Sequence, residues 1–151
     1  MLRRYKYSGL LAVAELMGSV LAERLQHEKK PDLLIPMPLH PTRLGERGFN
    51  QAVEIARVLC RRLQLPLEPH ACSRLRPTPP QAGLSLRDRR RNLRGAFACH
   101  QDMSGKHIVL LDDVMTTGAS LDALAHAVKD AGAARVECWV VARTPKDQDT
   151  P

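Results

Sequence analysis

Aromatic residues are scarce in this 151-residue sequence, where two tyrosines, two phenylalanines and one tryptophan make up only 3%. The core must therefore be built from aliphatic side chains, and base stacking is a poor route to nucleic-acid binding. No apolar run reaches the roughly 18 residues of a membrane helix, and no signal peptide is visible. The four cysteines (Cys60, Cys72, Cys99 and Cys138) lack C-x-x-C spacing, which disfavours a zinc knuckle and gives no sign of a disulfide framework. We therefore expect a cytoplasmic protein with reduced, mostly buried thiols.

Acidic residues are outnumbered, because 16 aspartates and glutamates face 23 lysines and arginines, which leaves a net charge of +7. The excess is concentrated in residues 73–95, called here the arginine-rich segment, where Asp88 is the single acid. Its arginines are Arg74, Arg76, Arg87, Arg89, Arg90, Arg91 and Arg94. Such a segment attracts anions, and the planar guanidinium matches the geometry of phosphate oxygens. We expect it to form a basic, flexible loop.

The hydrophobic pattern predicts one domain in which helices and strands alternate. Helices are expected over residues 9–26, from an Asn50 cap to about residue 63, from Ser85 for a short stretch, and over residues 119–131. Strands are expected at residues 33–35, 67–74, 95–99, 107–111 and 135–142, and a polar loop at residues 40–48. This alternation of helices with continuous apolar strands predicts an α/β fold, with a mainly parallel twisted sheet flanked by helices.

The sequence HIVLLDDVMTTGAS, residues 107–120, contains the pattern that carries most chemical information. An apolar run leads directly into Asp112 and Asp113. Because adjacent strand residues point to opposite faces, both carboxylates can serve one ligand only where a strand ends, so we expect the strand to end here. Ionised carboxylates accept hydrogen bonds, so a vicinal diol or a divalent cation is a suitable partner.

Residues 116–120, Thr-Thr-Gly-Ala-Ser, are expected to form a phosphate cradle at the N-terminus of the next helix. Backbone N–H groups are unpaired there and the helix dipole is positive. Thr116, Thr117 and Ser120 add hydroxyl donors, and Gly118, which precedes Ala119, lets the backbone approach a ligand closely. An acidic pair near a phosphate cradle fits a ribose 5-phosphate. The absence of G-x-x-x-x-G-K-[ST] and G-x-G-x-x-G disfavours a nucleoside triphosphate and a dinucleotide.

Residues 109–120 resemble the 5-phosphoribosyl-1-pyrophosphate (PRPP) motif of the type I phosphoribosyltransferases: an apolar strand, two acids, two apolar residues and Thr-Thr-Gly-x-Ser. Other segments resemble the ComF/GntX group of phosphoribosyltransferase-like proteins, which is associated with DNA uptake and competence. They are Tyr5-Lys6-Tyr7, residues 35–40 (IPMPLH), residues 47–51 (RGFNQ), and then Arg74, Thr78, Gln81, Arg90, Asn92, Ala96 and Phe97. The group's usual zinc-binding segment with paired cysteines has no counterpart before Tyr5 in this sequence.

The resemblance implies a role for each matching position. Asp112 and Asp113 would be the catalytic pair on the ribose hydroxyls, and residues 116–120 would bind the 5-phosphate. Pyrophosphate would be bound by Met37, Pro38, Leu39 and His40, with Arg43 and Arg47 nearby, although a structural role for His40 fits equally well. Arg74 and Gln81 would be the contacts of the closing loop. Mg²⁺ would be held mainly by substrate oxygens, with no direct protein ligand, and residues 1–30 would form a partial hood over the acceptor.

Two functions remain open after these considerations. The first is an enzyme that transfers the phosphoribosyl group from PRPP to an unidentified acceptor and releases pyrophosphate. The second is a non-catalytic factor in DNA uptake, which binds PRPP or a nucleotide and contacts nucleic acid through the arginine-rich segment. The expected ligand in both is PRPP or another ribose 5-phosphate compound. The expected macromolecular partners are nucleic acid or DNA-uptake proteins, and insertion into a membrane is not expected.

Overall fold

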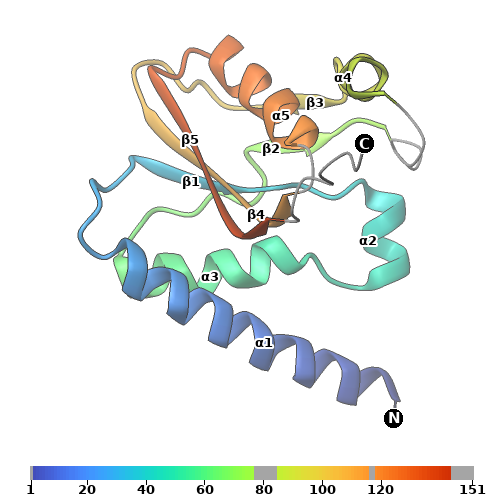
Figure 1. Cartoon of the computed structure of the whole chain (residues 1–151), viewed down its shortest axis with the longest axis vertical. Helices are drawn as coiled ribbons and strands as arrows, with labels where there is room; N and C mark the ends of the chain where they lie inside the picture. Colours follow the sequence, from blue (N-terminus) through green and yellow to red (C-terminus); the bar gives the residue numbers. More distant parts are fainter. Residues whose placement is uncertain (1, 77–84, 116–117, 144–151) are drawn as a thin grey trace, which may run out of the picture.

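The computed structural model describes residues 2–76, 85–115 and 118–143. A three-stranded parallel sheet, in the order β1-β4-β5, lies between two layers of helices (Figure 1). The strands are β1 Leu33–Pro36, β4 His107–Met115 and β5 Arg135–Arg143. A separate antiparallel pair consists of β2 Cys72–Arg74 and β3 Phe97–Cys99. The predicted α/β fold with a mainly parallel sheet flanked by helices is therefore confirmed.

The helices divide between the two faces of the sheet (Figure 1). On one face lie α1 Leu2–Leu25 and α3 Gln51–Leu63, and on the other lies α5 Ala119–Asp130 together with β2 and β3. Two short helices, α2 Pro41–Arg47 and α4 Leu86–Leu93, complete the fold. The predicted helices are all present, and the first begins earlier in the chain than its apolar periodicity indicates. No helix of the described residues is both long and apolar enough to cross a bilayer.

The central strand β4 explains the continuous apolar run of the sequence, because both of its faces are buried. Ile108 and Leu110 pack in a core with α5, β2 and β3, which we call the α5-side core. Val109 and Leu111 pack in a second core with α1 and α3, the α3-side core. The alternation along β4 thus divides the apolar residues between two layers.

The packing of α1 against α3 depends on small residues. Ala14, Gly18 and Ala22 are the buried positions of α1 facing α3. A Cβ atom placed on Gly18 would lie 2.6 Å from the Cβ of Val58 on α3. Because Val58 is branched at that atom and cannot turn it away, the close approach of the two helices requires glycine.

The predicted polar loop over residues 40–48 is wrong, because residues 41–47 form α2. The N–H of Thr42 donates to Nδ1 of His40 at 3.2 Å, and Pro41 occupies the first helical position, where a missing N–H costs nothing. Gly48 ends the helix in the left-handed conformation, with φ of 77°. These local signals outweigh the polar composition on which the prediction of a loop was based.

The arginine-rich segment contains regular structure at both ends. Arg74 is the last residue of β2, and α4 begins after Ser85, whose Oγ accepts a hydrogen bond from the Asp88 N–H at 3.2 Å. This confirms the predicted helix start. The middle of the predicted flexible loop, residues 77–84, lies outside the described residues.

Candidate functional site

The carboxyl ends of β1 and β4 lie side by side. Pro36 of β1 pairs with Leu111 of β4, and the next N–H, that of Met37, donates to the Leu111 carbonyl at 2.8 Å. The loop that begins at Met37 and the acid that follows Leu111 therefore come from neighbouring strands at one edge of the sheet. Ligands of parallel α/β sheets bind at this edge. The fold thus brings together the loop predicted to bind pyrophosphate and the acids predicted to bind ribose.

Asn50 fixes the position of this loop. Its Oδ1 accepts a hydrogen bond from the Ala52 N–H at 3.0 Å, which caps α3 as predicted. Its Nδ2 donates to the Met37 carbonyl at 2.9 Å, a contact that the sequence did not reveal. The sequence predicts that a capping asparagine has an amide N–H free to donate a second hydrogen bond, but it does not show which carbonyl accepts that bond.

The loop residues differ in what they can offer a ligand. Met37 and Pro38 have buried side chains, whereas Leu39 and His40 are half-buried. His40 uses Nδ1 to cap α2, so only its Nε2 is left for another partner. The exposed Arg43 and Arg47 lie on α2, with Arg47 in the last turn, at the opposite end of that helix from His40.

The acidic pair lies within β4, because the strand continues to Met115. The prediction that the strand ends at Asp112 and Asp113 is therefore wrong, since β4 remains paired with β5 at Asp112 and at Val114. The two acids are nevertheless close partners: Oδ1 of Asp112 accepts a hydrogen bond from the Asp113 N–H at 2.8 Å. Burial, together with a side-chain hydrogen bond to Asp113, raises the pKa of Asp112 to about 7.

Arg74 lies within electrostatic reach of Asp112, and Arg43 lies within electrostatic reach of Arg74. Burial lowers the pKa of Arg74, the charge of Arg43 lowers it further, and Asp112 opposes both effects. The Arg74 guanidinium also lies over the Phe97 ring, 5.1 Å from its centroid. Arg43 from α2, Arg74 from β2 and Asp112 from β4 thus form one cluster. Gln81, the other predicted closing-loop contact, lies outside the described residues.

The start of α5 follows β4 directly in the chain. Gly118 caps the helix with φ of 78°, and the Asp122 N–H makes the first helical hydrogen bond, to the Gly118 carbonyl at 2.8 Å. Ala119 is buried and Ser120 is half-buried. The positive end of the α5 dipole therefore lies just beyond the carboxyl end of β4, where an anion would be stabilised. The predicted phosphate-binding Thr116 and Thr117 are outside the described residues.

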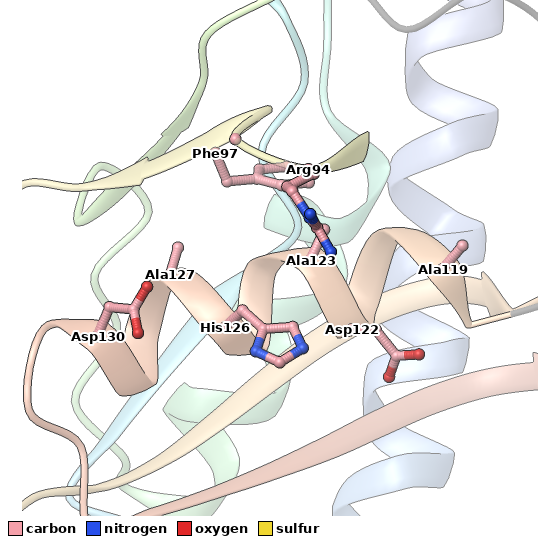
Figure 2. A pocket seen from close by; sticks show the side chains of 9 residues that line it. Arg94, Phe97, Ala119, Asp122, Ala123, His126, Ala127 and Asp130 are labelled. Atoms are coloured by element: carbon pink, nitrogen blue, oxygen red, sulfur yellow. The ribbon is translucent and has the colours of Figure 1, made fainter. Parts of the chain in front are cut away.

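A cavity of about 720 Å³ lies between α5 and the segment that joins α4 to β3 (Figure 2). Its lining consists of Arg94, Gly95, Phe97, Ala119, Asp122, Ala123, His126, Ala127 and Asp130. Figure 2 shows Arg94 and Phe97 on one side and the α5 residues on the other. Neither acid of the pair is in this lining, and Ala119 is the residue shared with the predicted phosphate cradle. The cavity therefore adjoins the candidate site and does not contain it.

Comparison with known proteins identifies the family. Residues 50–151 match the phosphoribosyl transferase domain. The chain belongs to this family. The chain is 34% identical over 150 residues to the DNA utilization protein YhgH of Escherichia coli O157:H7, and 30% identical over 152 residues to competence protein F of Haemophilus influenzae. Each alignment covers 95% of this chain and 66% of the relative, so the chain spans just under two thirds of their length. The resemblance to the ComF group is thereby confirmed.

Solved structures show the same fold at low sequence identity. The glutamine PRPP amidotransferase from B. subtilis superimposes with a TM-score of 0.60 at 16% identity, over 87% of this chain and 26% of that one. The purine phosphoribosyltransferase from Pyrococcus horikoshii gives 0.55 at 21% identity, over 90% of this chain and 76% of that one. The fold predicted for this phosphoribosyl transferase domain, that of the type I enzymes, is therefore confirmed.

Proposed function

We propose that this domain binds PRPP with Mg²⁺ at the shared edge of β1 and β4, and that it transfers the phosphoribosyl group to an acceptor. One observation carries the proposal: the acidic pair, the start of α5 and the cations Arg43 and Arg74 meet at that edge. PRPP presents a diol, a monophosphate and a pyrophosphate. The edge offers carboxylate acceptors, N–H donors and guanidinium groups that suit each of them.

Each part of the substrate then has a proposed partner. The ribose hydroxyls donate to Asp112 and Asp113, and the 5-phosphate accepts from residues 116–120. The pyrophosphate lies against residues 37–40 and the Arg43 guanidinium, while Arg47 is a more distant contributor on the same helix. Gln81 would act from the closing loop. The position of the Met37 backbone, which Asn50 holds, sets the distance between the two phosphate-binding regions.

Mg²⁺ fits this donor set. The described residues contain no cluster of three or more acidic, histidine or cysteine side chains that could hold a metal ion. Substrate oxygens beside the two neighbouring carboxylates would be suitable ligands for Mg²⁺, which retains several waters. When bound with the substrate, it would supply charge neutralisation at the pyrophosphate oxygens.

The proposed reaction breaks the bond between ribose C1 and the pyrophosphate oxygen and forms a bond between C1 and the acceptor, which loses a proton. Arg43 and Arg74 stabilise the negative charge that develops on the departing pyrophosphate. Asp112 and Asp113 hold the ribose so that C1 faces the acceptor, which reduces the entropy cost of the encounter. Positioning and charge therefore account for the chemistry, and no covalent intermediate with the protein is required.

The biological setting that we infer is the use or uptake of DNA in the cytoplasm. The names of the relatives, DNA utilization protein and competence protein F, support a role in the use or uptake of DNA. The free cysteines fit a reducing compartment. Within that setting, DNA-uptake proteins are the proposed macromolecular partners of the whole protein.

A non-catalytic role in binding nucleic acid is the second candidate, and one observation favours it. Arg76, Arg87, Arg91 and Arg94 are exposed, and together they form a basic surface around α4. Contacts of these side chains with phosphates would give an affinity that falls steeply with salt. Binding of PRPP at the sheet edge would then act as a signal and would not lead to transfer.

Calorimetric titration with PRPP and Mg²⁺ tests the site. Asp113→Asn and Thr117→Ala should each weaken binding by about tenfold to a hundredfold, since each removes a hydrogen-bonding partner of a charged or polar group of the ligand. Asp130→Asn is the matched control, because it removes the same charge from the exposed far end of α5. If wild type and both site variants bind alike, the site assignment is wrong.

A screen of nucleobases for release of pyrophosphate separates the two candidates. Release that depends on one base identifies the acceptor class and supports the enzyme. Tight binding of PRPP with no release for any base supports the second candidate instead, particularly if DNA binding shows the salt dependence.

A further inference from the structure

Cys72 and Cys99 face each other across the antiparallel pair β2–β3. The register pairs Cys72 with Cys99 and Arg74 with Phe97. The backbone hydrogen bond from His100 N–H to the Ala71 carbonyl, at 2.8 Å, lies one position outside the cysteine pair. At the other end of the ladder, one position beyond Arg74 and Phe97, the Leu75 N–H donates to the Ala96 carbonyl at 2.7 Å. The positions of the cysteines relative to the backbone hydrogen bonds on either side of them are therefore known.

These backbone hydrogen bonds show whether the two cysteines form a hydrogen-bonded or a non-hydrogen-bonded pair of the ladder. Hydrogen-bonded and non-hydrogen-bonded pairs alternate along an antiparallel ladder. Because Ala71 and His100 form a hydrogen-bonded pair, Cys72 and Cys99 form a non-hydrogen-bonded pair. In such pairs the Cα atoms are about 4.5 Å apart and the side chains are closest. Disulfides are found from about 4.4 Å upwards, so a bond can form here without moving the strands apart.

The two thiols differ in their surroundings. Cys72 is buried in the α5-side core, and burial raises the pKa of its thiol, with Cys99 as a further cause. Cys99 is only half-buried, and its Sγ–H donates to the Gln101 carbonyl at 3.4 Å. An oxidant therefore reaches Cys99 first, and Cys72 is placed to react with the oxidised sulfur.

We propose that Cys72 and Cys99 form a reversible disulfide, which makes the β2–β3 pair a redox modification site beside the PRPP site. With a peroxide as oxidant, the Cys99 sulfur attacks the O–O bond and becomes a sulfenic acid, releasing one water. The Cys72 sulfur then displaces the hydroxyl group from Cys99, and a second water leaves. Two thiols have lost two electrons and two protons, and one hydrogen peroxide has become two waters. A dithiol reductant reverses the bond by exchange.

The bond would act on the site through Arg74. Alternate strand residues share a face, so Cys72 and Arg74 point the same way, as do Cys99 and Phe97. Arg74 stacks on Phe97 and interacts with Asp112, and the cysteine pair is the next pair on the same face of the ladder, two positions from this arginine. A cross-link restricts the movement of that pair. This link to ligand affinity rests on the proposed function, whereas the disulfide itself does not.

Thiol counting tests the disulfide directly on the full chain. The reduced protein has four cysteines, and after treatment with hydrogen peroxide the count of free thiols in denaturant should fall to two. The mass should fall by two hydrogens, and peptide mapping should join Cys72 to Cys99. Treatment with dithiothreitol should restore all four thiols. Retention of four thiols, or a cross-link between other cysteines, overturns the proposal.

Variants separate this pair from general oxidation. Cys138→Ser is the matched control: Cys138 is an exposed cysteine on β5, and the variant should still lose two thiols. Cys99→Ser should lose the ability to form the cross-link. Cys72→Ala should also lose the cross-link. If this substitution in the core prevents folding, Cys99→Ser still provides the test, because Cys99 is only half-buried. Formation of an intramolecular disulfide in either variant contradicts the assignment.

Titration of the oxidised and reduced forms with PRPP and Mg²⁺ tests the link to the site. The oxidised form should bind at least threefold more weakly, because Arg74 is less free to adapt to pyrophosphate, and dithiothreitol should restore the affinity. Equal affinity of the two forms overturns the link. Failure of the reduced protein to bind PRPP counts against the proposed function alone, since the thiol count is independent of the ligand.

Discussion

The two faces of the sheet use similar cores for different purposes. The α3-side core is closed by α1 and α3 with aliphatic side chains and a glycine at the helix contact. The α5-side core has comparable aliphatic packing, but Cys72 and Phe97 bring β2 and β3 into it, and Arg74 lies at its edge. One face therefore supports the sheet, and the other also adjoins the candidate site.

The two cores differ because different kinds of element pack on the two faces of the sheet. On the α3 side, α1 and α3 meet through small residues, and the ion pairs between them are solvent-exposed. On the α5 side, β4 leads into the N-terminus of α5, and β2 brings a cation towards Asp112. Free peptide groups and charges gather where a helix begins, and the candidate site lies on that face.

Gly18→Ala should have the largest effect on the supporting face. The added Cβ would lie 2.6 Å from the Cβ of Val58, and overpacking of this kind destabilises by about 2 to 3 kcal/mol. Gly9→Ala, on the same helix with nothing within 4 Å of the added atom, should instead stabilise by up to about 1 kcal/mol. Urea unfolding followed by circular dichroism measures both. Equal effects at the two glycines would contradict the close helix contact.

Asp112→Asn, at the candidate site, should stabilise the fold instead of destabilising it, and the size of this effect should depend on pH. The pKa of Asp112 is about 7 in the fold, above the value of about 4 in an unfolded chain. The fold therefore disfavours the charged form, and its stability falls as pH rises from about 4 to about 7. Because the side chain is partly exposed, we expect the variant to be more stable than wild type by about 1 to 3 kcal/mol at pH 8.

The measurement for Asp112→Asn is the free energy of unfolding across this pH range. The advantage of the variant should shrink towards pH 4, where the carboxyl group is neutral in both states. Asp130→Asn, at an exposed position, serves as the control for loss of one negative charge. A constant difference between wild type and Asp112→Asn at every pH would mean that the carboxyl group is not the cause.

Glu15→Gln should have the smallest effect, although it removes two ion pairs on the supporting face. Glu15 on α1 lies 3.2 Å from Arg61 and 3.6 Å from Arg62 on α3. All three side chains are about half exposed or more, so the variant should lose no more than about 0.5 kcal/mol. Urea unfolding at low and high salt measures the loss. A loss as large as that of Gly18→Ala would show that charges, not close packing, join the two helices.

Prediction from the sequence succeeded where the signal was local. The caps at Asn50 and Ser85 and the apolar run of β4 each depend on neighbours in the chain, and the structure confirms them. The loop predicted at residues 40–48 was wrong because composition was given more weight than the capping signals of His40, Pro41 and Gly48. The end of β4 was predicted too early because pairing with β5 continues past the acids, and a partner strand is not visible in local sequence.

By itself, the sequence determined the fold class, the order of the elements apart from α2, and the identity of the acid pair. These features depend on hydrophobic periodicity and on residue types at short spacing. Only the tertiary structure decided that Arg74 lies between the charges of Arg43 and Asp112, that Asn50 holds the Met37 backbone, and that Cys72 faces Cys99. These contacts join segments far apart in the chain, and they exist because packing and strand register bring those segments together.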